Sequence, residues 1–154
     1  MNWDAIGAVG EILGAISVLA TLVYLAQQIR QSNKIATASS EISIRDNFST
    51  INAAIYENEE IAQLFVNAED PDHQFSKVEH MRLRGLLTQL VNVWISIEAA
   101  YNNGMASKAS FDNIFDDVIQ VTTGWPATRP IFAEIIEAFP SHEETELFKA
   151  VRNI

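Results

Sequence analysis

The chain has 154 residues with no Cys, and its 20 acidic residues outnumber ten basic ones, for a net charge of -10 at pH 7. The lack of Cys excludes disulfides, thiol catalysis and thiolate metal sites. The acidic balance, without any cluster of Lys or Arg, argues against nucleic acid as a partner, because phosphate contacts need clustered basic residues. The length suits one membrane span plus one domain of about 120 residues.

The chain begins with an apolar stretch, residues 5–29 (AIGAVGEILGAISVLATLVYLAQQI), that contains no Lys, Arg or Asp and one Glu. At about 1.5 Å of rise per residue, its length suits one crossing of a hydrocarbon layer about 30 Å thick. Trp3 and Tyr24 stand about 30 Å apart along a helix axis, the separation expected of interfacial aromatic anchors. The sequence therefore predicts a transmembrane helix within residues 1–29, surrounded by membrane lipid.

The basic residues predict the orientation of this span. None precedes Arg30, whereas Arg30, Lys34 and Arg45 follow it. The positive-inside rule then places the C-terminal side in the cytoplasm and the N-terminus outside, with Arg30 and Lys34 as anchors at the inner interface. Two alternatives stay open. One is a cleaved signal peptide, which would need a basic start that MNWD lacks. The other is a buried helix of a soluble all-α domain, whose apolar run is usually about 10–14 residues and so shorter than residues 5–29.

Small residues follow one another at spacings of 3, 4, 3 and 4 within the span, which makes one stripe on a helix. This small-residue face consists of Gly7, Gly10, Gly14, Ser17 and Thr21. Small residues let helices approach closely in lipid, so we expect this face to meet another transmembrane helix, although glycine is also simply frequent in membrane helices. Glu11 borders the face. It could reach the outer headgroups, hold a partner helix by a hydrogen bond, or line an ion or proton path.

The segments WDAIGAVGEILGA and LVYLAQQIRQSNKI carry a resemblance to a known group. The chain is similar to small bacterial proteins of no established activity, each with one N-terminal span and a helical C-terminal region. The specific part covers about the first 35 residues and extends loosely along the rest. The resemblance implies this architecture and a bacterial inner-membrane location, and it transfers no catalytic residue.

After the span, residues 30–57 contain neither Gly nor Pro. Their apolar residues recur at helical spacing, at Ile44, Phe48, Ile51 and Ile55. They predict a juxtamembrane amphipathic helix that continues the membrane helix or bends away from it. Asn58 is then expected to cap a short second helix that ends before Asp70.

Ser76 and Glu79 form a capping box that predicts a long helix to about Asn103, ended by Gly104. Its apolar positions repeat at 4, 3, 4, 3 and 4, at Leu83, Leu87, Leu90, Trp94, Ile97 and Tyr101. Its middle is apolar nearly all round, which is typical of a helix surrounded by others. The apolar part is too short and too polar for a second membrane crossing, so we expect the hub of a helical bundle.

Three further helices complete the expected bundle. The first, over residues 107–122, is predicted to place one apolar side inward (Phe111, Ile114, Phe115, Val118, Ile119) and one acidic side outward (Asp112, Asp116, Asp117). Gly124, Trp125 and Pro126 break it. A second helix carries Ile131, Phe132, Ile135, Ile136 and Phe139. A second capping box, Ser141 with Glu144, opens a final helix with Leu147, Phe148 and Val151 inward.

The chemistry-bearing residues match no known signature. The histidines His73, His80 and His142 lack the spacing of zinc or di-iron helical sites, and no nucleotide-binding or nucleophile motif occurs. We therefore expect no metal, no cofactor and no enzymatic activity. The pair Asp112 and Asp116 is expected to be a solvated helix face, and Trp125 is expected to pack over the core, with a binding surface at its loop as the alternative.

The sequence thus predicts an all-α protein with a single N-terminal transmembrane helix (1–29), a juxtamembrane helix (30–57) and a cytoplasmic bundle of about five helices (58–154). The leading functional hypothesis is a non-enzymatic assembly or accessory subunit of a membrane protein complex, docked in a homo-oligomer or a larger complex through its small-residue face. One alternative is a homo-oligomeric ion channel or ion-coupled element with Glu11 facing the axis. Another is a membrane-anchored cytoplasmic binding module.

Overall fold

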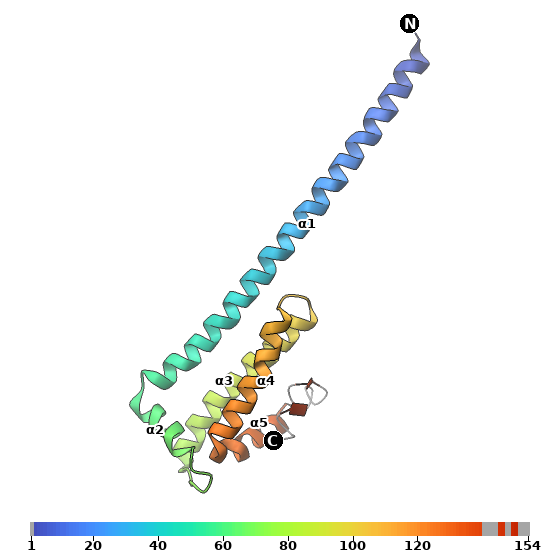
Figure 1. Ribbon diagram of the computed structural model, residues 1–154. Helices are drawn as coiled ribbons and strands as arrows, with labels where there is room; N and C mark the ends of the chain where they lie inside the picture. The colour runs from blue at the N-terminus through green and yellow to red at the C-terminus, as the bar shows by residue number, and fades with distance from the viewer. Residues whose placement is uncertain (1, 140–144, 147–148, 151–154) are drawn as a thin grey trace. The chain divides into compact units, whose positions relative to one another are not determined.

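The computed structural model describes residues 2–139, 145–146 and 149–150, and this part of the chain contains helices and no strand (Figure 1). The elements are α1 (Trp3–Tyr56), α2 (Glu59–Asn67), α3 (Lys77–Asn102), α4 (Lys108–Gly124), the 3-10 turn η1 (Pro126–Thr128) and α5 (Arg129–Glu137). The predicted all-α class is confirmed over these residues. The chain divides after Ala38 into two compact units, residues 1–38 and 39–154.

The first unit is a single stretch of helix. α1 has no break between Trp3 and Tyr56, and its N-terminal part is long and apolar enough to cross a membrane, with a mean hydropathy of 2.0 and no part of that window buried. Leu and Ile side chains along residues 6–29 are about half exposed or more. Ser17 and Thr21 satisfy their hydroxyls within the helix by donating to carbonyls four residues earlier.

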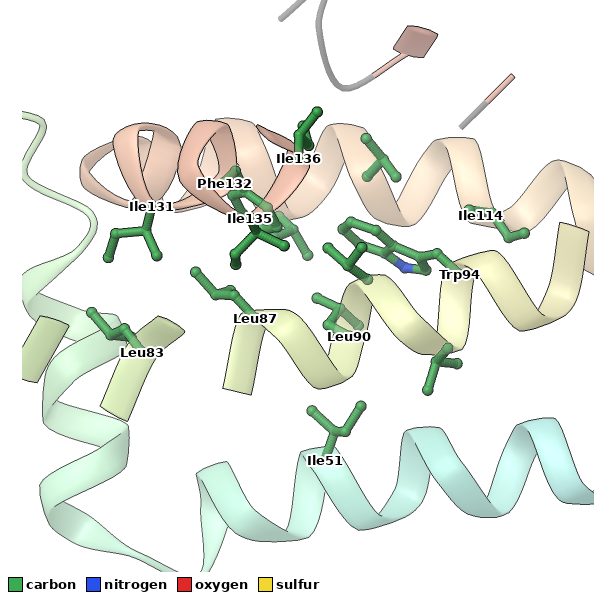
Figure 2. Close-up of a cluster of buried hydrophobic side chains, with 14 of the residues drawn as sticks. Ile51, Leu83, Leu87, Leu90, Trp94, Ile114, Ile131, Phe132, Ile135 and Ile136 are labelled. Carbon is green, nitrogen blue, oxygen red and sulfur yellow. The ribbon is translucent and has the colours of Figure 1, made fainter. Parts of the chain in front are cut away.

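The second unit is a helical bundle built around α3, which contacts α2, α4 and α5. Figure 2 shows Leu87, Leu90 and Trp94 of α3 between Ile51 of α1 on one side and the side chains of α4 and α5 on the other. Trp94 is fully buried, and its ring stacks on Phe132 with centroids 6.0 Å apart. The prediction of α3 as the hub is confirmed, and residues 39–56 belong to the same unit as the bundle.

The ends of the helices follow the predicted local signals. The Asn58 side chain accepts a hydrogen bond from the Ile61 N–H, which caps α2. Ser76 and Glu79 make both bonds of the capping box at the start of α3. After α3, Gly104 takes a φ of +69°, a conformation that costs glycine little because it has no Cβ. Helix starts and stops were therefore readable from the sequence.

The predicted faces of α4 need correction. Ile119, expected inward, is 54% exposed, whereas Val121 and Thr122 are buried beside Ile114 and Val118. Asp117, expected on the outer face, lies at the edge of the buried side. α4 is therefore rotated relative to the predicted face, because the residues that pack on α3 follow Ile114, Val118 and Val121. Ser141, Glu144, Leu147, Phe148 and Val151 of the predicted final helix lie outside the described residues.

Candidate functional site

The small-residue face lies along the first unit, where its glycines have open space around them. A Cβ built on Gly7, Gly10 or Gly14 would meet nothing within 4 Å among the described atoms. Beside Ser17 and Thr21 the helix surface forms a shallow groove of about 230 Å³, lined also by Val18 and Leu22. The face therefore offers backbone and small side chains to a neighbouring surface.

The other candidate residues of the span are all exposed. Glu11 lies on the open helix surface, as do Trp3 near the start and Tyr24 near the far end. The Gln28 side-chain amide donates a hydrogen bond of 2.9 Å to the Tyr24 hydroxyl, which holds the polar end of that ring beside another polar group. Arg30 and Lys34 are exposed farther along α1. Each residue is thus placed where a membrane interface or a partner could contact it.

The second unit contains a cavity of about 420 Å³ where the end of α1 meets α2, α3 and α4. This size falls in the usual range of small-molecule sites. Its walls are mainly apolar and aromatic, with two carboxylates and two side-chain amides. We call it the acidic cavity; its lining consists of Phe48, Ile51, Asn52, Ile55, Tyr56, Phe65, Glu69, Leu86, Leu87, Leu90, Asp117, Gln120, Val121, Gly124 and Trp125.

Asp117 is the polar group of this cavity that the core holds in place. The buried Trp94 Nε1–H donates a 2.7 Å hydrogen bond to Asp117 Oδ2. Burial raises the pKa of the Asp117 carboxyl above its ordinary value, and the Trp94 hydrogen bond opposes the shift because it stabilises the charged form. The other oxygen, Oδ1, receives no hydrogen bond from any described residue. The carboxylate therefore keeps an acceptor available.

Aromatic rings form one side of the acidic cavity. The Trp125 ring packs against Phe65 of α2 with centroids 4.5 Å apart and the planes tilted by 57°. Trp125 is half-buried and packs against the hydrophobic core, which confirms that it covers the core. It also lines the cavity, as does the exposed Tyr56 at the end of α1. The loop tryptophan thus covers the core and also lines the cavity, and a binding surface at its loop stays a prediction.

A second concave region, of about 440 Å³, lies between the loop before α3 and the start of α5. Its lining includes His73, His80 and Arg129. His80 Nε2 is 3.3 Å from a carboxylate oxygen of Glu134, and Arg129 Nε donates to the Thr122 carbonyl. Among the described residues, no group of three His, Cys, Asp or Glu side chains could hold a metal ion.

Two other acidic residues of α3 and α4, Asp112 and Glu98, make structural contacts. Asp112 pairs with Lys108, whose Nζ lies 2.6 Å from a carboxylate oxygen, and Asp116 is exposed, so the expectation of a solvated pair is confirmed. Glu98 is 6% exposed, and its Oε1 accepts a hydrogen bond from the Glu146 backbone N–H. This buried carboxylate connects α3 to the C-terminal segment and was not singled out from the sequence.

Asp117 and Trp94 were not predicted to meet, although a signal for it exists. Asp117 follows Ile114 by three residues and precedes Val121 by four, so it borders a stripe drawn through the buried positions of α4. The side predicted from the sequence shared Ile114 and Val118 with this stripe but extended to Phe115 and Ile119, which left Asp117 on the opposite side. How α4 packs on α3 decides which residues are buried beside Ile114 and Val118.

Comparison with known protein families, with curated proteins and with solved structures finds no match to this chain. The class that the fold defines is an all-helical protein with one long apolar N-terminal helix and a separate helical unit. The resemblance to small single-span bacterial proteins stays a prediction.

Proposed function

We propose that the protein is a single-span inner-membrane protein that acts as an assembly or accessory subunit of a membrane complex. The observation that carries the proposal is the apolar part of α1, of which no residue is buried. Residues 6–29 present large apolar side chains that the rest of the described chain does not cover, and lipid would remove them from water. Its helical unit would lie in the cytoplasm, because the basic residues follow the span.

The small-residue face supports docking rather than anchoring alone. Lipid solvates large apolar side chains as well as another helix does, so helices associate in membranes where small residues permit close backbone contact. Gly10 and Gly14 form a G-x-x-x-G pair with open space above them, and the groove beside Ser17 and Thr21 extends the same surface. A second transmembrane helix, from a copy or from another subunit, fits this surface.

The proposal is tested by replacing Gly10 and Gly14 with Ile in the full chain. The added side chains hold a neighbouring helix away, so the protein should leave its complex and migrate faster on a native gel after gentle detergent extraction. Ala8→Ile and Ala15→Ile make a comparable size change on other sides of the same helix and should leave migration unchanged. Unchanged migration of the glycine variants, with the wild type in a complex, would refute the docking role.

A second candidate function is a membrane-anchored cytoplasmic binding module. The acidic cavity favours it, because a cavity of about 420 Å³ with apolar walls and few polar groups is the usual form of a small-molecule site. In this role the span holds the module at the membrane and the helical unit binds the ligand. The two functions are compatible, since they use different units of the chain.

A further inference from the structure

We propose that the acidic cavity binds a compact organic cation, an ammonium group attached to an aromatic or aliphatic body. The inference rests on the binding-module role proposed above and is independent of how the span packs. It follows from three features of the cavity: the sign of its charges, the free acceptor on Asp117 and the aromatic wall.

The charged groups on the cavity wall have one sign. Asp117 and Glu69 line it, and the described lining includes no Lys, Arg or His. Apolar walls lower the local dielectric constant, which strengthens the attraction between these carboxylates and a bound cation. An anionic ligand would be repelled, and a neutral one would gain only the burial of its apolar surface.

Asp117 adds a directional contact. A carboxylate only accepts hydrogen bonds and has two oxygens with which to accept them. Trp94 donates to Oδ2, which fixes the side chain against α3 and leaves Oδ1 without a donor among the described residues. A ligand that completes this site must therefore donate, and a primary ammonium group donates while it also supplies the opposite charge.

The aromatic side chains favour the same ligand. Phe65 and Trp125 pack together on the wall, and Tyr56 stands nearby at the end of α1. The face of an aromatic ring carries a partial negative charge, so it attracts a cation, most strongly for Trp. The same rings, with Leu86 and Leu90 of α3, offer apolar surface to the body of the ligand.

The test uses three probes of nearly equal shape that differ in charge: benzylammonium, benzyl alcohol and benzoate. Each is titrated by calorimetry into the full chain in mild detergent at near-neutral pH and physiological salt. We expect the affinity for benzylammonium to be at least about tenfold higher than the affinity for benzyl alcohol, and we expect no binding of benzoate.

Two variants locate the binding at Asp117. Asp117→Asn keeps an oxygen that can accept from Trp94 but removes the charge, so benzylammonium affinity should fall about tenfold while benzyl alcohol is unaffected. Asp116→Asn removes a neighbouring exposed charge of the same helix and should change affinity less than about twofold, because exposed charges are screened. Near-ultraviolet circular dichroism of both variants checks that the tryptophan packing is retained.

The outcomes separate the ligand class from the binding role. Equal affinity of benzylammonium and benzyl alcohol would refute the proposal that the ligand is a cation, and it would leave the binding-module role in place. Absence of binding by all three probes at millimolar concentration would overturn both. Equal benzylammonium affinity in wild type and Asp117→Asn would show that the cation binds elsewhere, and would also refute the proposal.

Discussion

The hydrogen bond between Trp94 and Asp117 predicts an energetic coupling between α3 and α4. Trp94→Phe removes part of a fully buried ring, which costs about 1–2 kcal/mol because truncation to Ala costs about 3–5 kcal/mol. It also removes the donor to Asp117 Oδ2, 2.7 Å away. Loss of a hydrogen bond to a charged group costs about 1.5–3 kcal/mol, and the lower end applies here because water reaches a half-buried carboxylate. We expect Trp94→Phe to lower the free energy of unfolding by about 3 kcal/mol.

The coupling itself is measured by a double-mutant cycle with Trp94→Phe and Asp117→Ala. Each single variant breaks the same hydrogen bond. The double variant should therefore lose about 1–1.5 kcal/mol less free energy of unfolding than the two single losses added together. Urea unfolding is followed by tryptophan fluorescence in a Trp3→Phe background, where the tryptophans that remain all belong to the second unit. Trp125 is present in every member of the cycle, and it reports on this unit because it packs on Phe65.

A matched cycle with Asp116→Ala in place of Asp117→Ala provides the control. Asp116 is exposed on the same helix, so its cycle with Trp94→Phe should be additive within about 0.3–0.5 kcal/mol. If the Asp117 cycle is additive within the same limit, the hydrogen bond contributes nothing measurable and the reasoning from its geometry is refuted.

Three further predictions concern pH, capping and topology. Burial raises the folded-state pKa of the Asp117 carboxyl above its ordinary value of 3.8. The folded state is therefore favoured most below pH 3.8, where the carboxyl is protonated, and this contribution to the free energy of unfolding is lost as pH rises through the raised pKa. Wild type should therefore lose stability relative to Asp117→Asn over that window in urea melts, and a pH-independent difference would contradict this. Ser76→Ala removes one bond of the α3 capping box and should cost about 1 kcal/mol in the same melts, whereas no loss would show that the cap is replaceable. Since the chain has no Cys, single-cysteine variants can report the orientation of the span. Asn2→Cys should react with a membrane-impermeant maleimide on intact spheroplasts, whereas Asn103→Cys should react only after lysis. The reverse pattern would refute the predicted orientation.

Local sequence signals predicted most of the secondary structure. Asn58, Ser76 and Ser107 each precede a helix, and their side chains accept the first free N–H groups of that helix. A cap depends only on residues within one turn, so it can be read without knowing the fold. The apolar repeat of α3 was equally readable, because a helix that contacts neighbours on several sides is apolar on several sides.

The faces of α4 were not readable in the same way. The predicted apolar side of this helix consisted of Phe111, Ile114, Phe115, Val118 and Ile119. Packing on α3 buries Ile114 and Val118 of this set together with Val121, and it leaves Ile119 exposed. Hydrophobic periodicity gives the width of an apolar face, but the contact with a neighbouring helix decides its rotation.

The sequence by itself determined that the described part of the chain is helical, where α2, α3 and α4 begin, and that residues 3–29 lie in one apolar helix with a stripe of small residues. Only the tertiary structure decided that Asp117 meets Trp94, 23 residues away, and that Asp117 lines a cavity with Trp125 on its wall. The physical reason is range. Propensity, capping and periodicity act within a few residues, whereas a cavity and its charges arise from how separate helices pack against one another.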